Sequence, residues 1–153
     1  MNRFSKTVLL TGLFVGTTDI LSAFIMISFL RGHFPVEMFH YIAGGAVGVP
    51  KGLSGGIWTN LLGLFFHYLI AMTATLVFFL ALPRVSLLRF NKYLMGMLYA
   101  VAVNLFMSFV VLPLSALPSG GSFEFARTFI DWIILGCCLG IPIAFNAYRY
   151  YGY

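Results

Sequence analysis

Three polar side chains that could hold a proton or a small ion stand inside long apolar stretches of the sequence. Asp19 is the one acid between residues 8 and 30, His67 is the one histidine between 57 and 82, and Asn104 lies between 93 and 114. An ionised aspartate is costly in an apolar medium, and histidine is the side chain that titrates near neutral pH. These residue types could form a proton or ion site, or a polar clasp between helices.

The composition indicates that the surroundings of these residues are lipid. The chain has 153 residues, of which 61% are hydrophobic and 8% are charged, and its mean hydropathy is +0.98. A soluble domain has about a quarter charged residues. The net charge of +5 does not indicate nucleic-acid binding, because the basic residues lie at the ends of apolar runs and form no basic patch. Membrane lipid is therefore an expected partner, and nucleic acid is not.

Four stretches are long enough to cross the hydrocarbon core, which takes about 20 helical residues. The sequence predicts an all-α integral membrane protein, one transmembrane domain over residues 1–153, with spans at 8–30, 57–82, 93–114 and 126–148. The first run is longer than a signal-peptide core and contains Asp19, so we expect it to be retained. Residues 36–47, after Pro35, are apolar but too short to cross, which predicts an interfacial or re-entrant helix. Pro113 and Pro142 are expected to bend or end helices.

The flanking charges predict the orientation of the chain. With the N-terminus in the cytoplasm, six basic residues face the cytoplasm (Arg3, Lys6, Arg84, Arg89, Lys92 and Arg149) and three face outward (Arg31, Lys51 and Arg127). Cytoplasmic flanks carry the excess of Lys and Arg. Both termini are therefore expected on the cytoplasmic side of the membrane.

Each span carries small residues at helical spacing, and such residues let helices approach closely in lipid. The predicted packing glycines are Gly12, Gly16, Gly63, Gly96, Gly136 and Gly140. Asp19, His67 and Asn104 share faces with small residues, and each lies about halfway along its span. Because the spans alternate in direction, we expect these three residues to converge at one depth, near the bilayer midplane.

Two functions remain open for this polar cluster. The favoured interpretation is a structural or accessory membrane protein, in which the cluster is a clasp and helix contacts build a homo-oligomer or a larger complex with other membrane subunits. The alternative is a proton-linked transporter or channel that uses Asp19, His67 and Asn104. Transporters usually have more helices or an internal repeat, and no convincing repeat is found in this sequence.

Other candidate sites are weaker. Glu37 and His40 have the spacing that places two metal ligands on one helix face, and His33 lies nearby in the sequence. Glu124 could complete such a metal site at the outer surface. Only one copy of that motif exists, so a wet polar patch is the default and no metal is expected. Asp131 is expected to contact Arg127, four residues earlier, and to differ too much in depth from Asp19 to pair with it.

Catalysis and cofactor binding find no support in the motifs. No nucleophile elbow, zinc-binding His-Glu-x-x-His or phosphate loop occurs in the sequence. His67 is the one histidine within a span, so haem held between two histidines of the chain is not expected. Cys137 and Cys138 are adjacent in an apolar run, which is neither a metal spacing nor a disulfide framework. No cofactor is expected, and an enzyme is the least favoured class.

Part of the chain resembles a known family. The stretch Gly63-Leu64-Phe65-Phe66-His67 up to Pro83, then Gly96 to Pro113-Leu114, then a last span ending in Arg149, is similar to the YagU-like family of bacterial inner-membrane proteins. The resemblance covers roughly residues 57–149, while the N-terminal third matches less clearly and a long outer segment of that family is absent. It implies a bacterial inner-membrane location. That family is poorly characterised, and its association with acid tolerance makes a proton-linked role more attractive.

Overall fold

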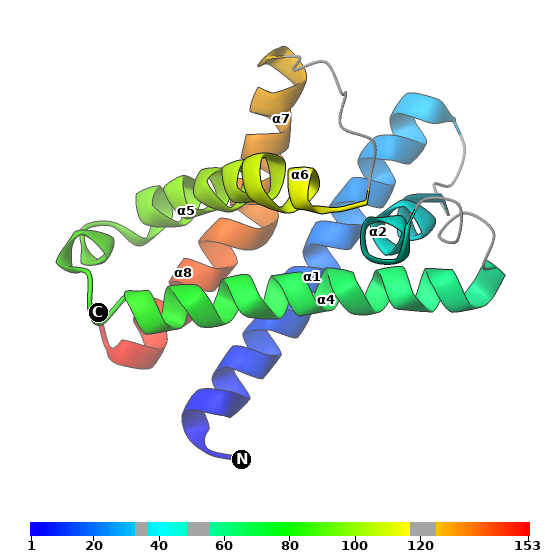
Figure 1. Cartoon of the computed structure of the whole chain (residues 1–153). Helices are drawn as coiled ribbons and strands as arrows, with labels where there is room; N and C mark the ends of the chain where they lie inside the picture. The colour runs from blue at the N-terminus through cyan, green and yellow to red at the C-terminus, as the bar shows by residue number, and fades with distance from the viewer. Residues whose placement is uncertain (33–36, 49–55, 117–124) are drawn as a thin grey trace.

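A computed structural model describes residues 1–32, 37–48, 56–116 and 125–153, and these ranges are helical with no strand (Figure 1). The elements are α1 (Arg3–Arg31), α2 (Glu37–Val47), α4 (Gly56–Ala81), η1 (Ser86–Arg89), α5 (Lys92–Phe106), η2 (Met107–Val111), α6 (Leu112–Leu114), α7 (Phe125–Leu135), η3 (Gly136–Gly140) and α8 (Ile141–Tyr151). Four helical spans in the described part are long and apolar enough to cross a membrane: Arg3–Phe29, Gly56–Ala81, Lys92–Leu114 and Thr128–Tyr151. The predicted all-helical fold with four such spans is thus confirmed.

The ends of the spans differ from the predicted ends by a few residues. α1 begins at Arg3 rather than at residue 8, because the side chain of Asn2 accepts a hydrogen bond from the Ser5 N–H (2.8 Å) and caps the helix. The short segment predicted at 36–47 is helix α2, of which residue 36 lies outside the described part. Hydropathy locates the apolar centre of a helix, whereas capping side chains decide where the helix starts.

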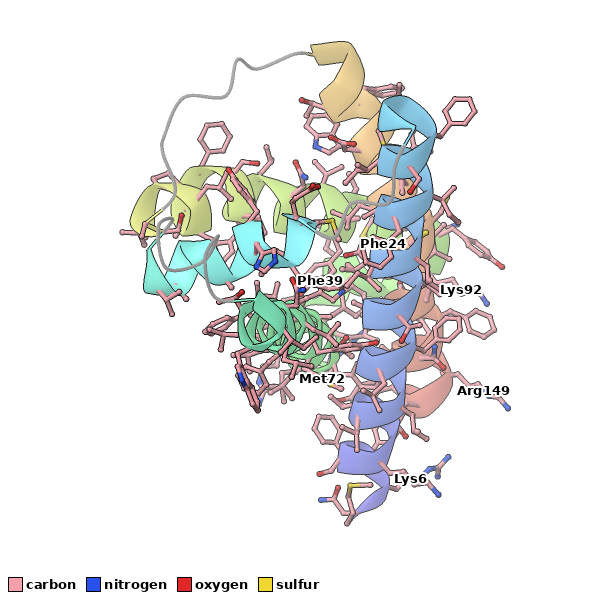
Figure 2. The ribbon with its side chains drawn as sticks, turned by 90° about the vertical axis from the view of Figure 1, so that its right-hand side faces the viewer. Lys6, Phe24, Phe39, Met72, Lys92 and Arg149 are labelled. Atoms are coloured by element: carbon pink, nitrogen blue, oxygen red, sulfur yellow. The ribbon has the colours of Figure 1, made fainter. Side chains whose placement is uncertain are left out.

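The four spans cross one another and do not run parallel throughout. α1 lies beside the continuous helix formed by α7, η3 and α8, and α5 also packs against that helix. α4 packs across α1 and α2, and it is seen end-on in Figure 2, where α1 stands upright. α4 and α5 meet through Tyr99, whose hydroxyl donates to the Ala74 carbonyl (2.6 Å) and whose ring contacts Phe78.

Glycine makes the closest of these crossings possible. At the contact of α5 with η3, a Cβ atom added to Gly96 would lie 2.8 Å from the Gly140 carbonyl oxygen, and one added to Gly140 would collide with the Gly96 carbonyl. The other four glycines predicted to pack also lie at helix contacts: Gly12 against Met72, Gly16 against Tyr68, Gly63 against the Phe39 backbone, and Gly136 against Met97. Backbone contact at small residues is the main source of helix association in lipid.

Two prolines change the hydrogen bonding of their helices without ending them. Pro113 and Pro142 each follow a wide π-helical turn, η2 or η3, in which one N–H bonds the carbonyl five residues back. Because Pro142 has no N–H, the Cys138 carbonyl loses its usual donor within the helix. The Thr18 hydroxyl of α1 donates to that carbonyl (2.8 Å). A neighbouring helix thus supplies the missing bond, which allows proline to remain in an apolar span.

One end of the molecule is a tightly packed apolar core. It contains the last turns of α4 and most of α8, with residues from the first half of α1; its members are Val8, Val15, Phe78, Phe79, Leu82, Leu139, Ile143, Ala144, Ala147 and Tyr148. The Tyr151 hydroxyl donates to the Phe79 carbonyl (2.9 Å), and Tyr148 donates to the Leu88 carbonyl. We call this region the closed end. The first and last turns of the chain meet there, since the Phe4 and Tyr150 rings lie 5.8 Å apart.

We expect Gly140→Ala to destabilise the protein by about 1–3 kcal/mol, because the new methyl group would overpack the contact with the Gly96 backbone. Thermal unfolding of the purified protein in detergent measures this loss. Cys137→Ala is the matched control, since Cys137 is exposed on the same turn. Equal stability of the two variants would show that the close contact of α5 with η3 is absent.

Candidate functional site

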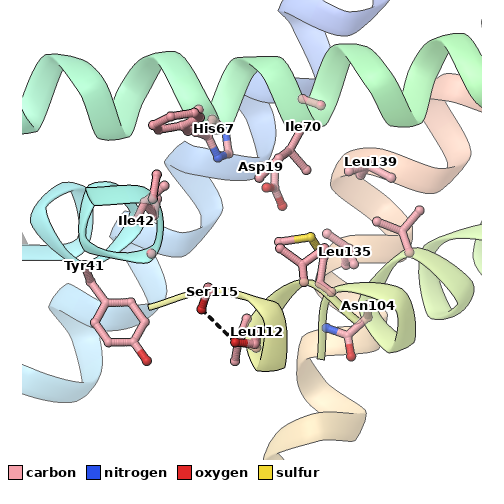
Figure 3. A pocket seen from close by; sticks show the side chains of 17 residues that line it. Asp19, Tyr41, Ile42, His67, Ile70, Asn104, Leu112, Ser115, Leu135 and Leu139 are labelled. Atoms are coloured by element: carbon pink, nitrogen blue, oxygen red, sulfur yellow. Dashed lines mark hydrogen bonds between the residues drawn. The ribbon is translucent and has the colours of Figure 1, made fainter. Parts of the chain in front are cut away.

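A cavity of about 380 Å³ lies between α1, α2, α4 and α5 (Figure 3). Asp19, His67 and Asn104, the three residues singled out in the sequence, line it, together with Tyr41 of α2. Its other wall residues are mostly apolar, and one end is lined by Gly45, Leu112 and Ser115. There the Ala116 N–H donates to the Gly45 carbonyl (3.0 Å) and joins α2 to the end of α6. We call this cavity the main cavity.

His67 joins α4 to α1. Its Nε2 lies 2.8 Å from the Gly16 carbonyl oxygen. A carbonyl can only accept, so Nε2 carries the hydrogen and donates it, and a second proton on the ring would have to reside on Nδ1. The adjacent Tyr68 hydroxyl lies 2.8 Å from the Thr17 hydroxyl. Since Thr17 also donates to the Leu13 carbonyl, the Tyr68 hydroxyl is the donor of this second link from α4 to α1.

Asn104 joins α5 to α7. Its Oδ1 accepts a hydrogen bond from the indole N–H of Trp132 (2.9 Å). The bond fixes which side of the amide is oxygen, because the indole can only donate. The NH₂ group of Asn104 is then left for the cavities that the residue lines. Like the bond of His67 to Gly16, the bond of Asn104 to Trp132 joins two helices.

Asp19 makes no such link. Among the residues that the structure describes, none donates a hydrogen bond to its carboxylate, although its backbone carbonyl accepts from Ser22 (2.7 Å). The carboxylate points into the main cavity in Figure 3, and His67 is the titratable neighbour whose charge acts on it. The structure thus brings the three predicted residues to one cavity but does not join them by direct bonds.

A second cavity of about 220 Å³ adjoins the first. Asp19 and Asn104 line both, so they stand between the two. From Asp19 the second cavity follows α1 as far as Ile27, and Asp131 of α7 lies in its wall. Asp19 and Asp131 were predicted to differ too much in depth to pair; the cavity, which extends over two turns of α1, is lined by both of them. The spacing of Asp131 and Leu135, four residues apart on one helix face, was the signal that sequence reasoning missed.

The candidates for a metal site are only partly described. His33, Glu124 and the side chain of Arg127 lie outside the described residues. Glu37 is the first residue of α2, and the Nδ1 atom of His40 lies 2.7 Å from the Thr59 hydroxyl, which also donates to the Gly56 carbonyl. In the described ranges no three side chains of metal-ligating type form a group. His40 is thus oriented toward α4.

No family model, curated protein or solved structure matches this chain. The site must therefore be interpreted from its own geometry. Two of its three central polar residues hold helices together, and the third, Asp19, faces open volume. That arrangement leaves one carboxylate able to exchange a proton or bind a cation within the bundle.

The cavities and the closed end predict different accessibility. In a Cys137→Ala/Cys138→Ala background, we expect Ser22→Cys to react with a membrane-impermeant thiosulfonate from one side of sealed vesicles, because Ser22 lines the second cavity. The matched small residue Ala144 is fully buried in the closed end, so Ala144→Cys should not react from either side. Equal labelling of the two cysteines would contradict the division into a hollow and a closed end.

Proposed function

We propose that this protein is a small proton-linked membrane carrier or channel in which Asp19 is the proton site. The observation that carries the proposal is the position of the Asp19 carboxylate, which lines two cavities beside His67 and receives no hydrogen bond from any described residue. An acid inside the apolar part of a membrane protein is rare and usually functional. Four helical spans able to cross a membrane support the membrane setting.

The hydrogen-bond partners of the three polar residues favour a proton site at Asp19 over a structural clasp between helices. A clasp built on Asp19 would need a donor from His67, Asn104 or a threonine. None of the described residues donates to the Asp19 carboxylate, whereas His67 donates to the Gly16 carbonyl and Asn104 accepts from Trp132. Within the described part of the chain, helix association is therefore supplied by bonds that do not involve the Asp19 carboxylate, and a carboxylate next to a histidine can take up and release protons as water reaches it.

The shape of the molecule supports a carrier with one open side. The main cavity reaches the ends of α2 and α6, whereas the closed end blocks the opposite half of the bundle. Transport would require the closed end to separate. The two π-helical turns are suitable hinges, because helices bend where the regular hydrogen-bond ladder is interrupted. Met107 and Val111 of η2 and Leu139 of η3 line the main cavity, so bending there would change its shape.

An accessory role in an oligomer is the second candidate. Within the span Lys92–Leu114, only 6% of the most apolar 18-residue stretch is buried inside the protein. The side chains of Phe109 and Leu114 are 70% and 82% exposed. A further apolar cavity of about 460 Å³ lies between α4 and α5. Such a surface would face lipid or the helices of a second copy or another membrane subunit. The mass of the complex recovered in mild detergent distinguishes a protein that works alone from one that works in an assembly.

We place the protein in the bacterial inner membrane with both termini in the cytoplasm. The excess of Lys and Arg around the termini and the α4–α5 connection supports this orientation. The contact of Phe4 with Tyr150, which brings both ends of the chain to the closed end, is consistent with it. The bacterial location rests on the resemblance to the YagU-like family.

The proposal predicts proton flux that depends on Asp19. In proteoliposomes with an imposed pH gradient, we expect the wild type to dissipate the gradient and Asp19→Asn to reduce the rate to that of empty vesicles. Asp19→Glu should retain part of the flux, because a carboxyl group remains. Glu37→Gln is the control for loss of an acid, since Glu37 is exposed at the start of α2 and lines neither cavity. Absence of flux in the folded wild-type protein, both in the pH gradient alone and with a second cation supplied to exchange for the proton, would contradict the proposal.

A further inference from the structure

The main cavity is much larger than a proton site requires. Its volume of about 380 Å³ falls in the range of small-molecule pockets, roughly 300–1,000 Å³. Filled with water it would hold on the order of a dozen molecules at about 30 Å³ each. Its walls, however, are mostly aliphatic and aromatic side chains, which give such a water cluster few hydrogen bonds. An apolar molecule fills this volume better than water does.

The polar groups of the cavity do not form a cage for an inorganic cation. Calcium takes six to eight oxygen ligands, and magnesium demands an octahedral set. The lining offers one carboxylate, that of Asp19, and single oxygens from the side chains of Tyr41, Asn104 and Ser115, which come from different elements. Among the described residues no three side chains of metal-ligating type form a group, so an inorganic ion would be underligated by side chains here.

The charge of the cavity selects a cation. Asp19 is the one acid among the residues that line it, and no lysine or arginine lines it. An anion would be repelled, and a neutral ligand would leave an ionised Asp19 unpaired at a cost in free energy. The rings of Tyr41 and Phe66 in the wall add favourable faces for a positive group.

We propose that the main cavity binds a small organic cation, an ammonium group carried on an apolar body, in exchange for one proton. The proposal rests on the proposed proton site at Asp19 and names its substrate class. In the empty site, the proton resides either on the Asp19 carboxylate or on Nδ1 of His67, since Nε2 already donates to Gly16. When the ammonium group pairs with the Asp19 carboxylate, that proton leaves to water, and the charge inside the protein is unchanged.

Among the described residues, few other titratable groups line the cavities around Asp19. His67 of α4 and Tyr41 of α2 line the main cavity, and Asp131 of α7 lines the second cavity. The wall residue of α5 beside Asp19 is Asn104, which does not titrate. Cation affinity is therefore expected to rise with pH while the exchanged proton is bound, and to level off once the empty site has lost it.

Benzyltrimethylammonium and its uncharged carbon isostere, neopentylbenzene, provide a matched pair of probes. We expect isothermal titration of the full chain in detergent to show binding of the cation that weakens at least about 30-fold in Asp19→Asn. Glu37→Gln should bind as the wild type does, and Asp19→Glu should recover part of the affinity. Wild type and Asp19→Asn should not differ toward the isostere, which removes the contribution of micelle partitioning. Titrations in two buffers of different ionisation enthalpy should report about one proton released per cation bound.

Several results would overturn the inference: equal cation binding by wild type and a folded Asp19→Asn variant, no binding by folded wild type, or binding without proton release. The vesicle assay, run without and with benzyltrimethylammonium inside the vesicles, separates this outcome from failure of the proposed function, because a strict exchanger moves protons only when the cation moves the other way. Proton flux that depends on Asp19, together with no cation binding, would leave the proposed function standing and remove the organic cation as its substrate. Cation binding without proton-linked flux would leave the organic cation as a ligand of the main cavity and remove the proposed proton-linked transport.

Discussion

The contact between α4 and α1 at His67 and Gly16 positions most of what surrounds the site. Because Gly16 has no side chain, Tyr68 and Ala71 of α4 can approach the α1 backbone, and the His67 ring reaches the Gly16 carbonyl. A hydrogen bond between membrane helices is worth about 0.6 kcal/mol, so the role of this bond is to fix geometry more than to supply stability. Because His67 Nε2 donates to the Gly16 carbonyl, it does not donate to Asp19, which lies one turn further along α1, and no other residue of α4 does. The Asp19 carboxylate is therefore left facing the cavity.

Hydrogen bonds between helices also hold the other side of the site. Trp132 holds Asn104, and the Thr18 hydroxyl satisfies the carbonyl that Pro142 leaves without a donor. Both bonds join helices through groups that would otherwise be costly in lipid. The tight glycine contact of Gly96 with Gly140 and the aromatic core of the closed end hold the remaining half of the bundle. The helix backbones therefore touch at the Gly96–Gly140 contact, whereas cavities lie between the helices around Asp19.

The sequence predicts a large part of this structure because length, hydropathy and small-residue spacing are local signals. They gave four spans, the short helix after residue 36 and glycines that lie at helix contacts. They could not give the steep crossing of α4 over α1, which depends on how particular side chains interdigitate. These signals identified Asp19, His67 and Asn104 as the polar residues of the site. They could not predict the hydrogen bonds of His67 and Asn104, because the partners are a backbone carbonyl and an indole on other helices. Asp131 was missed because depth was estimated residue by residue, whereas a cavity spans several turns.

Chemical modification of carboxyl groups tests most directly whether Asp19 faces open volume. The folded chain in lipid nanodiscs would be treated with a water-soluble carbodiimide and an amine, and the modified sites would be quantified by mass spectrometry. Glu37 is exposed and serves as the internal standard. The account predicts that Asp19 is modified in the folded protein, more slowly than Glu37 but to a measurable extent. Complete modification of Glu37 with none at Asp19 until the protein is denatured would contradict it, because Asp19 would then be a sealed structural residue.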